Sequence, residues 1–272
     1  MDVPTIGLAD GSRIPQVGLG LWRVGSGDDF RTSFAAALEA GYRHFDTAQA
    51  YGNEGALGEA LQAANVPRES VWITTKISVQ HMVAGQTRKS FGTSLAKLKT
   101  DYVDLLLLHF PVPVARKKAW KELEKIRTEG RARNIGVSNY TIKHLEQLKA
   151  YSGTVPAVNQ VELHVFLQQP ELVNYCREHG IVVEAYSPLA HAKCMNDPVI
   201  TDIATKHDKS YAQIMLRWAV ENGLIILPNS TTPERVRENI SLFDFELYLE
   251  DLQRLTKLDR NMRTCWNPTH IP

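Results

Sequence analysis

The sequence predicts a (β/α)8 TIM barrel in a single domain over residues 1–272, and two observations support this fold. Short apolar runs typical of buried parallel strands recur along the chain, most of them beginning roughly 22 to 32 residues apart, the length of a strand-helix unit. Amphipathic helical stripes such as Phe30, Phe34 and Leu38 fill the intervals between them. The predicted strands are Val17–Leu21, Arg43–Asp46, Val71–Lys76, Val103–His109, Asn134–Ser138, Ala157–Val161, Ile181–Tyr186 and Leu224–Leu227.

A doubly wound sheet is the alternative α/β architecture. It would usually carry a glycine-rich turn after its first strand, and no GxGxxG motif follows Val17–Leu21. The barrel is expected to carry an N-terminal β-hairpin over residues 5–15, because Asp10-Gly11 lies between short apolar runs. Such a hairpin could close the N-terminal end of the barrel. The segments expected after the last strand are a helix at Pro233–Ile240, an extra helix near Leu249–Leu258 and a short tail to Pro272.

The composition argues against several classes of protein. With 31 basic and 30 acidic side chains the net charge is +1, so we expect no nucleic-acid and no membrane-surface partner. No apolar run approaches the roughly 20 residues that span a bilayer, and residues 1–4 lack a secretory signal. The cysteines Cys176, Cys194 and Cys265 form no CxxC pair, which indicates reduced thiols, a cytoplasmic location and no metal site. A monomer is the default expectation.

Polar residues stand where three of the predicted strands end. Asp46, Lys76 and His109 each follow an apolar run, and Tyr51 comes five residues after Asp46 in a short loop. In a barrel of parallel strands the C-terminal strand ends form the rim of the active site. Each residue alone has ordinary structural explanations, such as a capped loop or an ion pair, but all four together predict a proton-donating site.

These four residues suit the reduction of a carbonyl group. A tyrosine is a poor acid at neutral pH, and we expect the Lys76 ammonium to lower the pKa of Tyr51. Asp46 could pair the buried Lys76, and His109 could orient a substrate oxygen. Such a site can protonate an oxygen that gains negative charge. No side chain donates hydride, so a nicotinamide cofactor is implied.

Motifs along nearly the whole chain resemble those of the aldo-keto reductases, and they occur in the family's order. The stretches that carry the resemblance are Phe45-Asp46-Thr47-Ala48, Tyr51-Gly52-Asn53-Glu54, Thr74-Thr75-Lys76, Leu108-His109-Phe110-Pro111, Gly136-Val137-Ser138-Asn139 and Asn159-Gln160-Val161-Glu162-Leu163-His164. The resemblance implies a (β/α)8 barrel that binds NADPH without a Rossmann fold. It also implies that Tyr51 is the general acid, that Lys76 and Asp46 tune it, and that His109 orients the carbonyl.

The resemblance implies a set of cofactor contacts as well. Ser138, Asn139 and Gln160 match the residues that hold the nicotinamide carboxamide, and Tyr186 matches the ring that stacks on the nicotinamide. Structural alternatives exist, because Ser138 and Asn139 could cap the next helix and Tyr186 could belong to the core. The remaining positions implied are Gly20 and Asp46, then Ser187 and Leu189 at the pyrophosphate, Asn229, Ser230, Thr231 and Arg235 at the 2′-phosphate, and Glu238 and Asn239 at the adenine.

Three positions depart from the family's pattern. Asn229 stands where the family usually has a lysine that contacts the 2′-phosphate. We therefore expect NADPH still to be preferred, with a smaller margin over NADH. Phe110 replaces a common tryptophan, and Leu21 replaces a common threonine or valine. Both of these changes alter the shape of the pocket rather than the proton donor.

Short details most resemble the bacterial 2,5-diketo-D-gluconate reductases. The short tail implies an open pocket for small carbonyl substrates, among them methylglyoxal, aromatic aldehydes, keto esters and diketo sugars. Two other functions stay open: a nicotinamide-binding regulatory protein with little turnover, and an aldolase that forms a Schiff base on Lys76. The residues expected to line the substrate pocket are Trp22, Tyr51, His109, Phe110 and Trp266.

Overall fold

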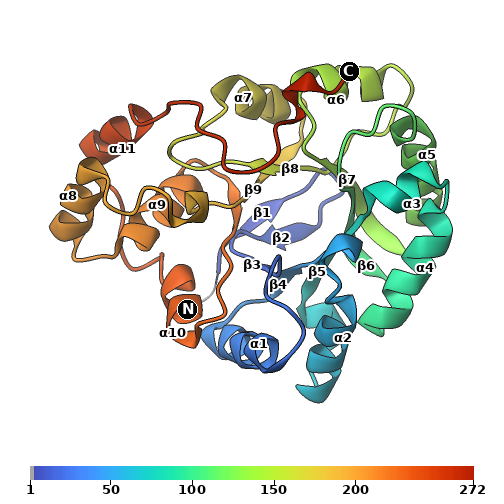
Figure 1. Ribbon diagram of the computed structural model, residues 1–272, viewed down its shortest axis with the longest axis horizontal. Coiled ribbons are helices and arrows are strands. Elements are labelled where there is room, and N and C mark those ends of the chain that lie inside the picture. The colour runs from blue at the N-terminus through green and yellow to red at the C-terminus, as the bar shows by residue number, and fades with distance from the viewer. Residues whose placement is uncertain (1–2) are drawn as a thin grey trace.

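Eight parallel strands surround a common axis in the computed structural model, which describes residues 3–272 (Figure 1). Their hydrogen-bonded order follows the sequence from β3 to β10, and a parallel bridge between Val17 and Ile226 closes the ring. The predicted (β/α)8 barrel is therefore confirmed. The strands are β3 (Leu19–Gly20), β4 (His44–Asp46), β5 (Trp72–Ile77), β6 (Val103–Leu108), β7 (Ala132–Ser138), β8 (Val158–Glu162), β9 (Val182–Tyr186) and β10 (Ile225–Leu227).

The helices lie on the outside of the sheet and cover it. Two helices, α8 and α9, separate β9 from β10, which explains the longer interval before the last strand. The helix predicted at Pro233–Ile240 is found with those bounds, and the extra helix ends at Thr256 rather than at Leu258. No helix within residues 3–272 is long and apolar enough to cross a membrane. The helices are α1 (Asp28–Ala40), α2 (Glu54–Ala63), α3 (Val79–Val83), α4 (Thr87–Leu98), α5 (Arg116–Thr128), α6 (Ile142–Lys149), α7 (Pro170–Glu178), α8 (Pro198–His207), α9 (Tyr211–Glu221), α10 (Pro233–Ile240) and α11 (Leu249–Thr256), with short 3-10 turns η1 (Gln49–Tyr51), η2 (Arg68–Ser70), η3 (Ala190–Ala192) and η4 (Pro268–His270).

Glycine makes the closure of the barrel possible. The first and last strands meet where the Gly20 amide donates to the Pro228 carbonyl at 3.0 Å. A Cβ atom on Gly20 would lie 2.9 Å from the Leu227 carbonyl oxygen, and one on Gly18 would lie 2.6 Å from His44 Nδ1. Any larger residue at these positions would push the strands apart. Gly20 therefore allows the backbones of the first and last strands to approach closely.

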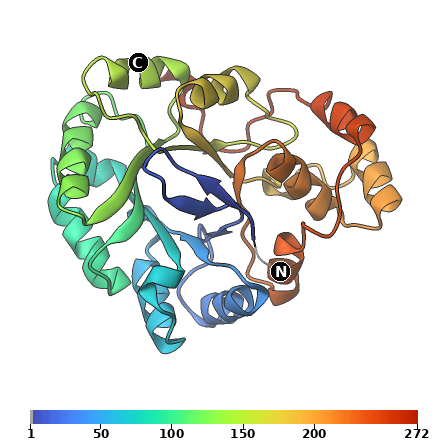
Figure 2. The same cartoon turned by 180° about the vertical axis from the view of Figure 1, so that it is seen from behind.

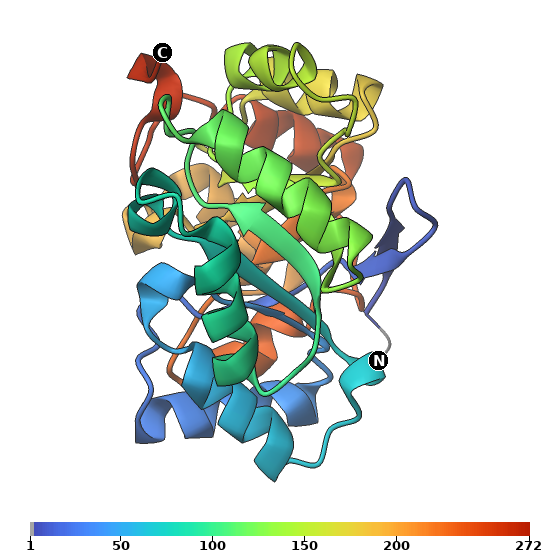
Figure 3. The same cartoon turned by 90° about the vertical axis from the view of Figure 1, so that its right-hand side faces the viewer.

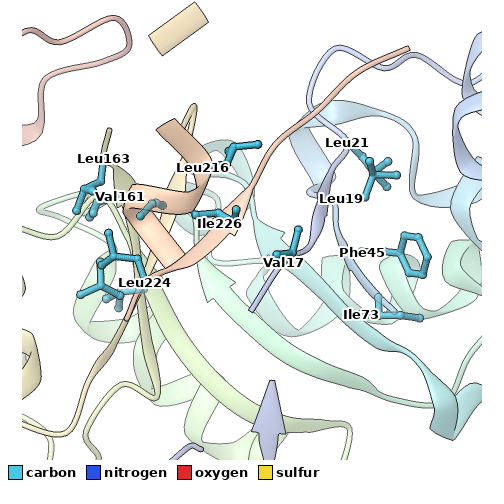
Figure 4. Close-up of a cluster of buried hydrophobic side chains, with 14 of the residues drawn as sticks. Val17, Leu19, Leu21, Phe45, Ile73, Val161, Leu163, Leu216, Leu224 and Ile226 are labelled. Carbon is cyan, nitrogen blue, oxygen red and sulfur yellow. The ribbon is translucent and has the colours of Figure 1, made fainter. Parts of the chain in front are cut away.

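Alternate residues of the strands divide the apolar side chains into two cores. Leu19, Phe45 and Ile73, on three neighbouring strands, belong to the large core between sheet and helices (Figure 4). Trp72 and Leu107 belong to the smaller core inside the barrel. Both cores are formed by buried side chains, so the sheet is covered on its two faces.

The N-terminal hairpin closes one end of the barrel. Its strands β1 (Thr5–Gly7) and β2 (Arg13–Pro15) pair antiparallel. In Figure 2 they lie at the centre of the view, across the end of the barrel that faces the reader. Figure 3 shows the hairpin at the opposite end of the molecule from the C-terminal tail. Ile14 is fully buried in the small interior core. The apolar plug leaves the other end, where the strands finish, for polar side chains.

Candidate active site

The loop after β4 presents Tyr51 on the short turn η1, and side chains on both sides of the tyrosine fasten this turn. Gln49 Oε1 accepts a hydrogen bond from the Ser78 amide at 2.9 Å. Asn53 Nδ2 donates to the Leu21 carbonyl at 2.8 Å. These bonds connect the turn to the segments that follow β5 and β3. The position of Tyr51 is therefore fixed by contacts that do not involve its own hydroxyl.

Lys76 lies at the centre of the predicted group. Its Nζ atom is 2.5 Å from Asp46 Oδ1, 3.1 Å from the Thr47 carbonyl oxygen and 3.3 Å from the Tyr51 hydroxyl. Lys76 is fully buried, and burial disfavours its charged form, but Asp46, with smaller effects of Tyr51 and Glu184, outweighs burial, so the pKa of Lys76 is raised. The structure thus holds a charged ammonium against the tyrosine.

The pKa of Tyr51 differs from the sequence-based expectation. Burial raises this pKa above its ordinary value of about 10, and the nearby Lys76 charge lowers it by less than burial raises it. Lys76 does lower the pKa of Tyr51, as expected. The expectation that this pKa falls below its ordinary value is wrong for the protein without cofactor. Tyr51 is therefore a protonated hydroxyl at neutral pH, ready to act as a donor.

His109 lies beside the tyrosine. The two ring centroids are 5.7 Å apart in an edge-to-face arrangement. Burial and the Lys76 charge lower the pKa of His109 to about 3, so its imidazole is neutral at neutral pH. A neutral imidazole can donate one hydrogen bond and accept another, which suits the binding of a substrate oxygen next to the Tyr51 hydroxyl.

Ser138, Asn139, Gln160 and Tyr186 form one connected group, although the sequence places them on three strand ends. Tyr186 donates to Asn139 Oδ1 at 2.7 Å, and Asn139 Nδ2 donates to Ser138 Oγ at 3.0 Å. Ser138 Oγ in turn donates to the Gln160 carbonyl at 2.9 Å. Asn139 adopts a left-handed backbone with φ of 65°, a conformation that asparagine tolerates better than most residues.

The donors and acceptors of this group fit a primary carboxamide. Such a ligand group needs an acceptor for its N–H groups and a donor for its carbonyl oxygen. Gln160 Oε1 accepts no hydrogen bond from residues 3–272, because the amide of Gln160 is oriented with Nε2 toward Asp46 and Glu184. Asn139 Nδ2 can supply the donor by giving up its bond to Ser138 Oγ. The half-buried Tyr186 ring adds a flat surface on the same group.

The outer cofactor positions lie on the loops after β9 and β10. Ser187 has a left-handed φ of 48°, and its hydroxyl lies 3.1 Å from His191 Nε2. Asn229 Nδ2 donates to the Trp22 carbonyl at 2.8 Å, so this side chain joins the loops after β3 and β10. Ser230 Oγ accepts from the Thr232 amide at 3.0 Å. Of the other predicted cofactor positions, Thr231 and Arg235 are exposed, Leu189 and Glu238 are half-buried, and Asn239 is buried.

The predicted pocket wall is assembled only in part. Phe110 and Trp266 are in edge-to-face contact, with ring centroids 6.2 Å apart. Trp266 nevertheless remains 71% exposed. Trp22 packs against His191 at 5.4 Å instead of against the other two aromatic rings. The aromatic side chains therefore do not form one continuous wall.

Two buried carboxyl groups next to the site were missed by reasoning from strand ends. Glu162 on β8 accepts hydrogen bonds from the amides of Thr264 at 2.6 Å and Cys265 at 3.1 Å, which fastens the C-terminal tail. Glu184 on β9 accepts from Gln160 Nε2 at 2.6 Å. Glu184 is an acid inside an otherwise apolar strand, and Glu162 is the last residue of β8, so both could have been identified from the sequence. No cluster of three or more metal-ligating side chains occurs among the residues that the structure describes.

Comparison with known proteins agrees with this geometry. A model of the Aldo/keto reductase family matches residues 16–260. Methylglyoxal reductase DkgA of Escherichia coli O157:H7 is 42% identical over 268 residues, covering 97% of this chain and 96% of its own. Glyoxal reductase of Bacillus subtilis (strain 168) is 40% identical over 267 residues, covering 98% and 97%. The crystal structure of Bombyx mori aldo-keto reductase (AKR2E4) in complex with NADP has a TM-score of 0.89 at 35% identity, covering 97% of this chain and 95% of that one.

Proposed function

This chain belongs to the aldo/keto reductase family and is an NADP-dependent oxidoreductase, and on this premise we propose that it reduces small aldehydes and ketones to alcohols with NADPH. The observation that carries the proposal is the contact of 3.3 Å between the Tyr51 hydroxyl and Lys76 Nζ, with the His109 ring beside the Tyr51 ring. Dicarbonyls such as methylglyoxal and glyoxal are the first substrates to test, because two relatives are named for them.

Four side chains have separate roles in the proposed reaction. His109 and the Tyr51 hydroxyl bind the carbonyl oxygen and set its direction. As hydride reaches the carbonyl carbon, Tyr51 transfers its proton to the oxygen and becomes a phenolate. The Lys76 ammonium stabilises that phenolate, and Asp46 keeps the ammonium in place at 2.5 Å. Bound NADPH supplies the hydride, and the side chains that would hold its carboxamide are Ser138, Asn139 and Gln160.

The remaining cofactor contacts belong to the same proposal. Ser187 and Leu189 would lie against the pyrophosphate, and Tyr186 against the nicotinamide ring. Ser230, Thr231 and Arg235 would hold the 2′-phosphate, with Asn229 nearby, and Glu238 and Asn239 would contact the adenine. The start of α10 favours an anion here, since its first N–H groups point toward this loop. With asparagine at position 229, NADH is proposed as a weaker second cofactor.

The test is to follow the oxidation of NADPH, with NADH in parallel, in the presence of methylglyoxal, a nitrobenzaldehyde and 2,5-diketo-D-gluconate. Turnover faster with NADPH than with NADH is the expected result, and the best of the three substrates identifies the substrate class. Tight binding of NADPH without turnover of any substrate would favour a regulatory nicotinamide-binding protein instead.

An aldolase that forms a Schiff base on Lys76 is disfavoured by the structure. An amine must lose its proton to attack a carbonyl. Asp46 raises the pKa of Lys76 and keeps it an ammonium. Borohydride trapping with a carbonyl substrate and no cofactor is therefore expected to leave Lys76 unmodified.

We further propose that the protein works in the cytoplasm as a monomer. The cysteines Cys176, Cys194 and Cys265 are free thiols, which supports a reducing compartment. Size-exclusion chromatography with light scattering tests the oligomeric state, and a mass near 30.6 kDa is the expected result.

A further inference from the structure

A second buried carboxyl group lies next to the Lys76–Asp46 pair. Glu184 on β9 is fully buried and stands beside Gln160 of β8 in the strand register. Gln160 Nε2 donates one hydrogen bond to Asp46 Oδ2 at 2.8 Å and another to Glu184 Oε2 at 2.6 Å. Both hydrogens of this amino group are therefore used. A flipped amide would point its carbonyl oxygen at two carboxyl groups, so Asp46 and Glu184 together set the orientation of Gln160.

The other oxygen of Glu184 faces a histidine. Glu184 Oε1 makes no hydrogen bond within the described part of the chain, and it lies 3.5 Å from His44 Nε2. His44 Nδ1 lies 3.2 Å from the Pro15 carbonyl, which can only accept, so Nδ1 carries a hydrogen. In a neutral His44, Nε2 is therefore an acceptor, and it has the Thr74 hydroxyl at 3.3 Å and Glu184 Oε1 at 3.5 Å as its neighbours.

An ionised Glu184 does not fit these contacts. Its Oε1 would lie 3.5 Å from the acceptor nitrogen of a neutral His44, and its charge would lie beside the Asp46 carboxylate. Lys76 compensates the charge of Asp46, so a second buried carboxylate would have no cation of its own. A hydrogen on Oε1 removes both conflicts, and Oε2 can still accept from Gln160.

The balance of burial and charge favours the same protonation state. Burial and the neighbouring Asp46 raise the pKa of Glu184 to about 8, against the opposing effects of Gln160 and Lys76. Burial and the Lys76 charge lower the pKa of His44 to about 3, against the opposing effect of the hydrogen bond to the Pro15 carbonyl. The proton consequently resides on the carboxyl group at neutral pH, and His44 stays neutral.

We propose that Glu184 is a positioning residue of the reductase site, protonated on Oε1 toward His44 and accepting through Oε2 from Gln160, which it thereby orients for the nicotinamide carboxamide. The proposal rests on the proposed function, because it assigns a role within the same reaction. Its consequence is a site that holds one positive and one negative buried charge, Lys76 and Asp46, in the working state.

Loss of this proton would weaken the proton donor. The titratable and charged groups that face Glu184 are His44 and Asp46 of β4, Lys76 of β5 and Tyr51 of η1, while the strand neighbour Ile225 on β10 is apolar. A carboxylate at Glu184 raises the pKa of Tyr51. Ionisation above a pH of about 8 should therefore slow carbonyl reduction.

Infrared spectroscopy of the protein without cofactor tests the protonation state directly. The difference spectrum between the wild type and Glu184→Gln at pH 6 is expected to contain the C=O band of a protonated carboxylic acid, which fades as the pH rises through about 8. A difference spectrum with only carboxylate bands at pH 6 would overturn the proposal, whether or not the protein proves to be a reductase.

The positioning role is tested by cofactor affinity and by pH profiles. Glu184→Leu removes the acceptor for Gln160 and should weaken NADPH binding roughly 3- to 10-fold in calorimetry. Glu184→Gln restores an acceptor without a titrating group, so it should recover affinity and move the alkaline fall in kcat to higher pH. Glu124→Gln on α5, whose carboxyl accepts from Ser152 at 2.6 Å outside the barrel, is the matched control.

The outcomes separate the two proposals. Unaltered NADPH affinity in Glu184→Leu, or pH profiles of Glu184→Gln and wild type that coincide, would overturn the role of Glu184. If Glu184→Leu does not fold, the pH profile of Glu184→Gln and the infrared spectrum still decide. Absence of turnover in the wild type would contradict the reductase function, and the infrared and binding results would then judge Glu184 alone.

Discussion

At the scale of single residues, the proposed chemistry depends on one buried ion pair. Tyr51 is a weaker acid than a free tyrosine because it is buried, so its proton leaves only if the resulting phenolate is stabilised. Lys76 is the cation in contact with it, and Asp46 is the anion that keeps Lys76 charged in a fully buried position. We therefore expect the rate and the stability of the protein to depend on the same two side chains.

Substituting Lys76 with methionine should affect both the stability and the rate. Lys76→Met leaves Asp46 as a buried unpaired carboxylate, which should lower the free energy of unfolding by about 3–5 kcal/mol. It should also reduce kcat by about 100-fold or more, because the phenolate of Tyr51 loses its partner. Urea unfolding and steady-state kinetics measure the two effects.

The double variant Asp46→Asn/Lys76→Met provides the decisive comparison. It removes the unpaired charge, so stability should recover toward the wild type while kcat stays low. Recovery of kcat together with stability would show that Lys76 acts only on folding. Lys125→Met, at an exposed lysine that pairs with Glu122 at 2.8 Å, is the control for removal of a lysine.

The position of a residue along its strand explains which site residues the sequence predicted. Asp46, Lys76 and His109 could be found because each stands where an apolar strand ends, at the rim. Glu184 and His44 lie deeper in the barrel, and the role proposed for each depends on a partner on a distant strand. Spacing along one strand does not show that pairing, and it did not show that burial outweighs Lys76 in setting the pKa of Tyr51.

At the scale of elements, the candidate site is bordered by loops and a tail that side-chain hydrogen bonds hold in place. Glu162 holds the tail, and Asn229 joins the loops after β3 and β10. The sequence predicted cofactor contacts for Gly20 and Asn229 and a place in the substrate pocket for Trp266 of the tail. It did not predict these two contacts, because each joins segments about 100 to 200 residues apart in a register that only the closed barrel defines.

Release of the tail is the expected effect of Glu162→Gln. Burial raises the pKa of Glu162, but hydrogen bonds from His164, Thr264 and Cys265 outweigh burial and lower it to about 2. Its ionised form therefore stabilises the tail above the unfolded pKa of about 4.3, and this contribution is lost as the pH falls toward 2. At pH 7 amide hydrogen exchange in the tail should become roughly 10- to 100-fold faster in the variant.

The control for this experiment is Glu146→Gln, at an exposed carboxyl group that accepts from Tyr175 on α7. Exchange in the tail should be the same in this variant as in the wild type. Equal exchange in Glu162→Gln and the wild type would show that other contacts hold the tail.

The Asn229→Lys substitution tests where the 2′-phosphate lies. A lysine at this position adds a cation next to the proposed phosphate site, so NADPH should bind about 3- to 10-fold more tightly relative to NADH. Calorimetric titration with both cofactors measures the ratio. Asn222→Lys adds the same charge before β10, at the opposite end of the barrel, and should leave the ratio unaltered. An unaltered ratio in Asn229→Lys would place the 2′-phosphate elsewhere.

At the scale of the whole molecule, the two ends of the barrel have different tasks. The hairpin β1–β2 fills the N-terminal end with apolar side chains, and the polar group occupies the C-terminal end. The order of the strands, the hairpin and the last two helices were all predictable, because periodicity and turn chemistry are local signals. The pair of helices α8 and α9 between β9 and β10 was visible in the sequence only as a longer interval between two predicted strands.

Ile14→Ala tests the structural task of the plug. Ile14 is fully buried among Trp72, Leu105 and Val158, so its truncation should lower the free energy of unfolding by about 2–5 kcal/mol. Val155→Ala, at a side chain that is 54% exposed, should change it by less than about 0.5 kcal/mol. Urea unfolding measures both. Equal stability of Ile14→Ala and the wild type would mean that the hairpin does not support the barrel.

The most direct test of the central claim is the comparison of Tyr51→Phe with the wild type in NADPH-dependent reduction of methylglyoxal. Tyr175→Phe, which loses only a surface hydrogen bond to Glu146, serves as the control. The account predicts that Tyr51→Phe loses about 100- to 10,000-fold in kcat while its affinity for NADPH equals that of the wild type. A variant that retains wild-type kcat would contradict the assignment of Tyr51 as the proton donor.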